Sequence, residues 1–325
     1  MRVLLIGSGG REHAMAWKLI QSQKITELIV APGNAGTAEL GENVPVMADD
    51  LDGLLAIAKT RSIDLTVVGP EQPLIDGISE LFQRHGLKIF GPSKNAARIE
   101  GSKIWSNDLM VKYAIPTADS VAFSESTKAI DYALARPEGS LVVKADGPAA
   151  GKGVLLPDTY EDLEIAVKGM LDGASFGESS SSLLLAERMS GPEVSVFAFL
   201  DGETVSAEIA ACDYKRIGEG DTGLNTGGVG AYAPPEFWTN ELAARVRMEI
   251  LEPTARALVA ENSAYSGVLY VGLMITSSGP RVIEFNCRLG DPECQVLMPK
   301  LVNDFLEICL AVAEGRLSQQ KVIWS

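Results

Sequence analysis

The chain has 325 residues, enough for two or three domains with a large apolar core, and 46% of them are hydrophobic. The net charge of −15 argues against nucleic acid as a general partner, because binding to a phosphate backbone requires a basic surface. No apolar run approaches the ~20 residues of a membrane span, and the first run, residues 2–6, ends at Gly7, as expected of a strand rather than a signal peptide. These features predict a cytoplasmic protein with no membrane partner.

Residues 1–101 alternate apolar runs with helix-like segments, and each run ends at a loop rich in Gly or Pro. This is the βαβ pattern of a parallel, doubly wound α/β sheet, in which ligands gather at the carboxyl ends of the strands. We expect strands at residues 2–6, 27–31, 64–68 and 87–90, followed by candidate ligand loops at residues 7–13, 32–37 and 69–74.

The loop at residues 7–13 lacks a complete dinucleotide-binding fingerprint. The third glycine is replaced by Glu12, and the second strand does not end in the acidic residue that binds ribose, so NAD is disfavoured. A helix N-terminus with exposed N–H groups beside Arg11 suits a single phosphate. The alternative is that Gly9 and Gly10 serve only the close packing of strand and helix.

Residues 102–325 combine helices and strands in the α+β manner. A helix capped by Ser102 ends before Pro116, and a small subdomain at about residues 118–187 is typical of a lid that closes on a nucleotide. We expect strands at residues 119–123, 183–186, 194–200, 204–211, 267–276 and 281–287, helices at 125–135, 160–171, 239–260 and 302–313, and a polar loop at 213–230.

Residues 142–155 contain two short β-runs joined by a glycine- and lysine-rich loop. Glycine lets backbone N–H groups approach an anion and lysine supplies positive charge, so the stretch indicates a phosphate cradle. A P-loop would place Ser or Thr after Lys152, where Gly153 stands, and a hairpin flap over a nucleotide therefore fits better. The alternative is an ordinary glycine-rich turn with surface lysines.

Residues 283–293 hold the densest group of polar side chains. Side chains two apart on a strand share a face, so Glu284 and Asn286 project together, and two neighbouring oxygen ligands suit Mg²⁺. Arg288 lies two residues further on, where it could neutralise a phosphate or a carboxylate. The alternative is a half-exposed strand with an ordinary ion pair. No C-x-x-C pair occurs, so we expect reduced thiols rather than a zinc site at Cys212, Cys287, Cys294 and Cys309.

Eight motifs follow one another between residue 7 and residue 293. They are G-S-G-G-R-E-H-A-x-A-W-K, A-P-G-N-A-G-T-A, G-P-E-x-P-L, K-I-F-G-P, E-G-S-K, V-K-A-D-G-x-A-A-G-K-G-V, N-T-G-G-x-G-A-Y and V-I-E-F-N-C-R-x-G-D-P-E. Together they resemble the glycinamide ribonucleotide synthetase family, also called phosphoribosylamine–glycine ligases. Any one motif is moderate evidence, whereas eight in family order are very specific.

The resemblance implies an ATP-grasp ligase of purine biosynthesis in which two α+β subdomains hold ATP and Mg²⁺, with Mn²⁺ as the alternative metal. A carboxylate attacks the γ-phosphate of ATP, and an amine then displaces phosphate from the acyl phosphate to form an amide. The family's acid is glycine and its amine is phosphoribosylamine. Such catalysis rests on positioning and charge, so no Ser/His/Asp or Cys/His arrangement is expected.

The resemblance also implies roles for individual residues. The implied ATP contacts are Lys103, Lys144, Gly147, Gly151, Lys152, Gly153, Glu187, Arg188, Met189 and Glu193. The implied substrate contacts are Gly9, Gly10, Arg11, Glu71, Asp213, Asn225, Thr226 and Gly227. Glu284 and Asn286 match the metal ligands, and Arg288, Lys215 and Arg216 are the candidates for stabilising charge during catalysis.

The sequence departs from the family pattern in two ways. Family members continue into a further C-terminal domain, whereas this sequence stops at Ser325. The alternatives are therefore a truncated paralogue that ligates a different acid and amine in a specialised biosynthetic pathway, a homodimer or partner chain that supplies the domain, or a non-catalytic ATP-binding protein. Individual residues also depart from the family pattern, and they put the identity of the substrates in doubt more than the use of ATP. They are Ser8, Asn107, Ala186, Cys212, Tyr214 and Leu224.

Overall fold

The computed structural model describes residues 1–147, 153–173, 181–220 and 222–325. The chain folds into two compact units, each built from more than one stretch of sequence. The first unit contains residues 1–97, 194–272 and 286–325, and the second contains residues 98–193 and 273–285. The predicted domain limits at residues 101 and 102, and the limits of the lid, stay predictions.

A five-stranded parallel sheet lies in the first unit, with the order β3-β2-β1-β4-β5. Residues 3–6 of β1 are fully buried, which explains why the sequence shows an apolar run here and not an alternation. The four predicted strands and their parallel arrangement are confirmed. The short polar β3 has no sequence signal of this kind. The strands are β1 (Arg2–Gly7), β2 (Glu27–Pro32), β3 (Glu42–Asn43), β4 (Leu65–Val68) and β5 (Ile89–Phe90).

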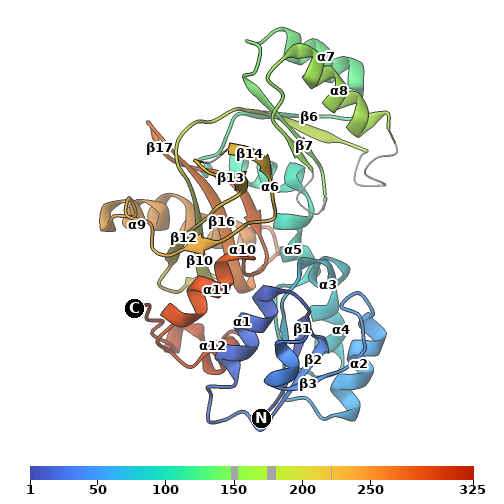
Figure 1. The fold of residues 1–325 in the computed structure, drawn as a ribbon, viewed down its shortest axis with the longest axis vertical. Helices are drawn as coiled ribbons and strands as arrows, with labels where there is room; N and C mark the ends of the chain where they lie inside the picture. Colours follow the sequence, from blue (N-terminus) through green and yellow to red (C-terminus); the bar gives the residue numbers. More distant parts are fainter. Residues whose placement is uncertain (148–152, 174–180, 221) are drawn as a thin grey trace. The chain divides into compact units, whose positions relative to one another are not determined.

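Helices cover both faces of this sheet (Figure 1). On one side α1 contacts α12, which packs against β5, and on the other side α2 contacts α4. Gly77, in the left-handed region at φ 96°, separates α3 from α4. The helices are α1 (Gly10–Leu19), α2 (Leu51–Thr60), α3 (Glu71–Asp76), α4 (Ile78–Arg84), α5 (Lys94–Gly101) and α12 (Phe305–Ala313), and a 3₁₀ turn spans Thr37–Glu39.

A second sheet has the order β15-β12-β10-β16-β17, with β11 paired to β10. The strand predicted at residues 204–211 is wrong, because it divides into β11 and β12. Leu200 pairs with Val205 and Phe197 with Ile209, so two residues of β10 face three residues of the other strand, as in a bulge. The strands are β10 (Glu193–Asp201), β11 (Thr204–Val205), β12 (Ile209–Asp213), β15 (Ala231–Tyr232), β16 (Ser266–Thr276) and β17 (Gly279–Asn286).

The segment predicted as a polar loop at residues 213–230 contains a hairpin, and this part of the prediction is wrong. Its strands, β13 (Arg216–Gly218) and β14 (Thr222–Asn225), pair antiparallel around Gly220, which has a φ of 70°. The predicted helix at residues 239–260 is confirmed as one run with a π-turn before Pro253, whose ring has no N–H to donate. Its parts are α9 (Asn240–Val246), the π-turn Arg247–Leu251 and α10 (Glu252–Ala260).

The C-terminal helices complete the first unit. The helix predicted to start at residue 302 starts at Phe305, because the Asp304 side chain caps it by accepting the N–H groups of Leu306 and Glu307. All four cysteines are buried, and none is in a disulfide among the described residues. The remaining elements are α11 (Glu293–Leu297) and 3₁₀ turns at Met298–Lys300 and Leu317–Gln319.

The second unit contains a four-stranded sheet of order β6-β9-β7-β8, against which α7 and α8 lie side by side (Figure 1). Two predictions are confirmed: Ser102 caps α6 by accepting the Trp105 N–H at 3.1 Å, and β7 pairs antiparallel with β8. No described helix is long and apolar enough to cross a membrane. The elements are α6 (Lys103–Lys112), β6 (Ser120–Phe123), α7 (Ser126–Leu134), β7 (Leu141–Ala145), β8 (Val154–Leu155), α8 (Tyr160–Leu171) and β9 (Leu183–Glu187).

The aromatic cluster between the two sheets of the first unit provides a test of the fold. Phe305 is fully buried, and its ring centroid lies 6.3 Å from those of Phe90 and Phe199. We expect Phe305→Ala to lower the free energy of unfolding by about 3–5 kcal/mol, measured by urea denaturation. Val302→Ala, at a side chain that is 61% exposed, should change it by less than about 0.5 kcal/mol. Equal losses in the two variants would contradict this assignment of the core.

Candidate active site

The predicted phosphate loop lies at the N-terminus of α1 in the first unit. Gly9 is the N-cap residue, and its N–H donates to Glu12 Oε2 at 2.6 Å. The N–H of Arg11 donates to Asp291 Oδ2 at 3.3 Å. Two of the N–H groups at this helix N-terminus are therefore bound to carboxylates of the protein, and a phosphate would compete with Asp291 for the Arg11 N–H.

The Arg11 side chain is buried and held by the protein. Its Nε lies 2.5 Å from Glu12 Oε1, and its Nη1 donates to the Leu289 carbonyl at 3.2 Å. Sequence reasoning placed Arg11 beside the loop but missed Asp291 and Glu12 as its neighbours. The contact with Asp291 has no local signal, because Asp291 lies 280 residues from Arg11 in the chain.

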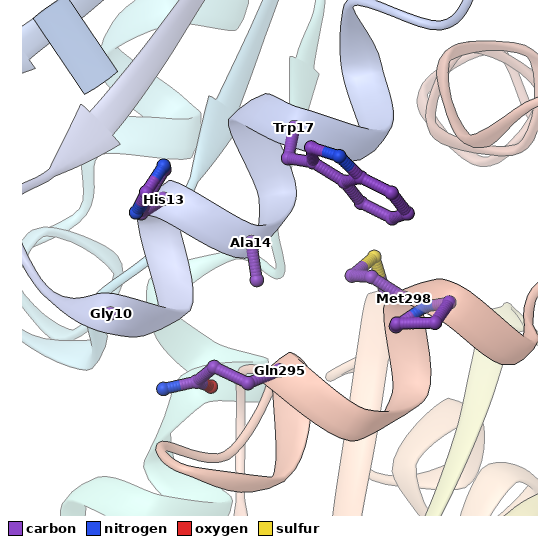
Figure 2. A pocket seen from close by; sticks show the side chains of 7 residues that line it. Gly10, His13, Ala14, Trp17, Gln295 and Met298 are labelled. Carbon is purple, nitrogen blue, oxygen red and sulfur yellow. The ribbon is translucent and has the colours of Figure 1, made fainter. Parts of the chain in front are cut away.

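A pocket of about 320 Å³ opens beside Gly10, between α1 and α11. Figure 2 shows the Trp17 indole above Met298 and the Gln295 side chain extending toward Gly10. His13 and Ala14 complete the α1 side of the pocket, and Pro299 completes the opposite side. The predicted substrate loop therefore borders a largely apolar pocket at its Gly10 end.

Arg288 donates to several acceptors among the described residues of the first unit. Its Nε donates to Glu71 Oε2 at 3.1 Å, its Nη2 to Asn286 Oδ1 at 3.2 Å and its Nη1 to the Leu289 carbonyl at 3.3 Å. The structure thus brings together three residues that were assigned separate roles from the sequence: a substrate contact, a catalytic arginine and a metal ligand.

The Glu71 carboxylate is stabilised in its charged form. Burial alone would raise its pKa, but the Arg288 guanidinium, the N–H of Glu71 itself and the more distant Arg11 outweigh this effect and lower the pKa. The side chains of Glu71 and Arg288 are 32% and 17% exposed, so solvent screens the pair only in part.

The candidate metal ligands fit Mg²⁺ in their chemistry. Glu284 and Asn286 lie two residues apart near the end of β17 and offer a carboxylate and an amide oxygen. Asn286 is buried, and the bond from Arg288 to its Oδ1 fixes the orientation of the amide. Among the described residues no cluster of three or more His, Cys, Asp or Glu side chains is placed to hold a metal. Mg²⁺ does not require such a cluster when nucleotide phosphates and water complete its shell.

The hairpin segment of the first unit carries the other predicted substrate and catalytic residues. Lys215 Nζ lies 3.7 Å from Asp213 Oδ1, and the Thr226 hydroxyl donates to the Lys215 carbonyl at 2.8 Å. Arg216 is exposed on β13, and Asn225 ends β14. Gly227 follows directly after Thr226 in the exposed part of this segment. Lys215, Asp213 and Thr226 are therefore close together, and their roles remain predictions.

In the second unit, two of the predicted ATP-binding lysines flank the start of the glycine-rich loop. Lys144 is buried on β7 and its Nζ donates to the Ile283 carbonyl at 2.9 Å. Lys103 Nζ donates to the Gly147 carbonyl at 3.2 Å. Gly153 lies just before β8, whereas Gly151 and Lys152, the tip of the predicted flap, lie outside the described residues.

The pKa of Lys144 is lowered, chiefly by burial. The nearby Lys103 lowers it further, and Glu284 and Glu193 act in the opposite direction. A buried ammonium with few protein acceptors is poised to gain from an anion, because an added negative charge offsets its desolvation. This is the electrostatic setting expected of a lysine that binds phosphate.

Residues 187–190, which by the family resemblance present main-chain groups to adenine, begin at the last residue of β9. Glu187 pairs with Arg281 at 3.0 Å, and Arg188 pairs with Asp158 at 2.7 Å. Met189 follows outside any helix or strand, and Glu193 begins β10. Sequence reasoning missed Arg281, since an arginine on a half-exposed strand gives no sign that its partners lie elsewhere in the chain.

This fold, a parallel sheet followed by the two sheets of an ATP-grasp module, defines an ATP-grasp enzyme. The phosphoribosylglycinamide synthetase N domain matches residues 1–100, and the ATP-grasp (A) domain of the same synthetase matches residues 101–294. Because these models cover most of the sequence, the chain belongs to the phosphoribosylglycinamide synthetase family.

Individual relatives agree with this assignment. Phosphoribosylamine–glycine ligase of Pasteurella multocida is 48% identical over 327 residues, which is all of this chain and 76% of the relative. The crystal structure of the Thermotoga maritima phosphoribosylamine–glycine ligase is 33% identical and matches with a TM-score of 0.84 over 97% of this chain and 76% of that one. Biotin carboxylase of Campylobacter jejuni matches 99% of this chain and 73% of its own at 18% identity and a TM-score of 0.72, which supports the fold alone.

The ion pair between Glu71 and Arg288 predicts a pH-dependent contribution to stability. Because the folded protein lowers the Glu71 pKa from its ordinary value of 4.5, this contribution is present above that value and is lost as the pH falls through the folded pKa. We expect Glu71→Gln to lower the free energy of unfolding by about 1 kcal/mol at pH 7 and by progressively less below pH 4.5. Urea titrations across this pH range measure the difference. Glu39→Gln, at an exposed position, is the control, and a Glu71→Gln deficit that stays constant with pH would contradict the assignment.

Proposed function

We propose that the protein is a phosphoribosylamine–glycine ligase, which joins glycine to phosphoribosylamine at the expense of ATP. The observation that carries the proposal is the position of the buried Lys144. Its ammonium donates to the Ile283 carbonyl, and Ile283 belongs to β17, the strand that also carries Glu284 and Asn286. The family models and the ligases of Pasteurella multocida and Thermotoga maritima support the choice of acid and amine.

In this mechanism, a carboxylate oxygen of glycine attacks the γ-phosphorus of ATP, and the bond to the β,γ-bridging oxygen breaks to release ADP. The amine of phosphoribosylamine then attacks the acyl carbon, loses a proton and expels inorganic phosphate, which leaves the amide. No covalent bond to the protein is required. The protein contributes the positions of the reactants and the compensating charge.

Each group of residues has a distinct part in the proposal. Lys144 and Lys103 bind ATP phosphates, and the main chain at residues 187–189 binds adenine. Arg288, already oriented by Glu71, stabilises the anionic group that forms during transfer. Glu284 and Asn286 would hold Mg²⁺, or Mn²⁺ in its place, and such a metal would supply the positive charge that neutralises phosphate. Gly9, Gly10 and Arg11 contact the phosphoribosyl group, and we place the enzyme in the cytoplasm.

A second candidate function is ligation of a different acid or amine. The observation that favours it is the exposed apolar surface of the hairpin segment, where Tyr214 and Leu224 are 57% and 82% exposed beside the predicted substrate contacts. Both residues depart from the family pattern. Such changes next to a substrate loop alter the partner of the reaction more readily than its use of ATP.

ADP release by the purified protein tests the proposal. The assay contains Mg·ATP with glycine, with and without phosphoribosylamine generated in situ. Release that needs both substrates supports the proposed ligase. Release with another acid or amine, and none with this pair, supports the second candidate. ATP binding without release in any mixture would contradict both and identify a nucleotide-binding protein.

Lys144→Met tests the central role of the buried ammonium. Methionine keeps the apolar stem and removes the charge, so we expect the fold to persist and kcat to fall by about 100- to 1,000-fold. Lys168→Met, at an exposed lysine on α8 that pairs with Glu164, is the matched control in the same unit and should keep full activity. Unchanged kcat in Lys144→Met would exclude this lysine from catalysis.

A further inference from the structure

Two connections of the second unit lie against strands β16 and β17. The connection into β6 is fixed at Thr117, whose hydroxyl donates to the Val282 carbonyl at 2.9 Å, and at Pro116, whose carbonyl accepts the Val282 N–H at 2.8 Å. The connection out of β9 is fixed at Pro192, whose carbonyl accepts the Ile275 N–H at 2.9 Å. The chain therefore enters and leaves the sheet of β6, β7, β8 and β9 beside the hairpin of β16 and β17.

Arg281 on β17 joins these two connections with a single side chain. Its Nε and Nη2 donate to the Thr117 carbonyl at 2.9 and 2.6 Å, and its Nη1 lies 3.0 Å from Glu187 Oε2. All three guanidinium nitrogens therefore have acceptors. The Arg281 side chain is 23% exposed and the Glu187 side chain 46%, so water screens the ion pair on its carboxylate side, and the two bonds to the Thr117 carbonyl hold the guanidinium in place.

The clamp fixes the direction of the chain where the adenine segment begins. The Glu187 N–H donates to the Asp119 carbonyl at 2.8 Å, and its side chain turns toward β17. The next residue, Arg188, is held separately: its side chain pairs with Asp158 at 2.7 Å, and its N–H donates to the Ser140 carbonyl at 2.8 Å. Contacts to different parts of the unit therefore restrict the main chain where the following residues begin.

Gly191 shows how closely the segment after β9 approaches strand β16 of the β16–β17 hairpin. Its φ is 147°, and a Cβ at this position would lie 2.1 Å from the Ile275 carbonyl oxygen. The segment between Glu187 and Gly191 is therefore fixed at both ends, by the Arg281 clamp at the first and by close backbone contact at the second.

We propose that Arg281 is a positioning residue for the nucleotide base: by joining Thr117 and Glu187 it holds the main chain at residues 187–189 in the orientation that accepts adenine. The inference rests on the proposed function and goes beyond it, because it assigns base recognition to a side chain that does not itself touch the nucleotide. Loss of the clamp should weaken binding of the base and leave binding of the phosphates unchanged.

Calorimetric titration with two probes tests this separation. Mg·ADP reports on base and phosphates together, and Mg·tripolyphosphate reports on the phosphate site alone. We expect Arg281→Ala to raise the Kd of ADP about tenfold and to leave the Kd of tripolyphosphate and the KM of glycine unchanged. Arg281→Lys should recover part of the ADP affinity, because an ammonium can still pair with Glu187 but cannot make both bonds to Thr117.

Two further variants keep the test decisive. Arg245→Ala removes an exposed ion pair with Glu249 and should leave both Kd values unchanged. Glu187→Gln keeps the bonds to Thr117, provides a second measurement if Arg281→Ala does not fold, and should raise the Kd of ADP by a smaller factor.

Three outcomes overturn the inference. An unchanged ADP Kd in Arg281→Ala and Glu187→Gln shows that the clamp does not serve the base. Equal weakening of ADP and tripolyphosphate shows a general structural role. A wild-type protein that binds neither probe removes the proposed function and this inference together, whereas wild-type binding and turnover with no effect of Arg281 removes the inference alone.

Discussion

The backbone of β17 is the constraint on which the candidate site depends. A strand advances about 3.3 Å per residue and turns successive side chains to opposite faces, so the residues from Arg281 to Asn286 distribute their groups along about 17 Å. Within this length the strand supplies the arginine that pairs with Glu187, the carbonyl that binds Lys144 and the candidate metal ligands. A one-residue slip of register would turn the side chains of Arg281, Glu284 and Asn286 to the wrong face and would move the Ile283 carbonyl away from Lys144.

Cations occupy the candidate site although the chain as a whole is negatively charged. The net charge is −15, yet three of the cations assigned to substrate or phosphate, Arg11, Arg288 and Lys144, are largely buried and are oriented by acceptors of the protein itself. Arg11 is bonded to Glu12 and to the Leu289 carbonyl, Arg288 is paired with Glu71, and Lys144 donates to the Ile283 carbonyl. A fixed cation needs little reorganisation when an anion arrives, which is the arrangement that favours phosphoryl transfer.

The sequence predicted the features that are encoded locally. Fully buried strands such as β1 appear as apolar runs, and the Ser102 cap has its own short signature. The division of residues 204–211 was not predictable, because it depends on Ser206, whose buried hydroxyl accepts the Phe199 N–H across the sheet. The contacts of Asp291 with Arg11 and of Arg281 with Thr117 were missed for the same reason, since partners so far apart in the chain meet only once the sheets have formed. The roles of the individual site residues remain predictions.

The four buried cysteines have a practical consequence. Burial raises the pKa values of Cys294 and Cys309 well above normal, so hardly any thiolate forms there near neutral pH, and the thiolate is the species that reacts with alkylating reagents. Cys212 and Cys287 are shielded by the same packing. A thiol reagent added to this protein therefore labels molecules that have opened, and the rate of labelling reports how often the folded chain opens.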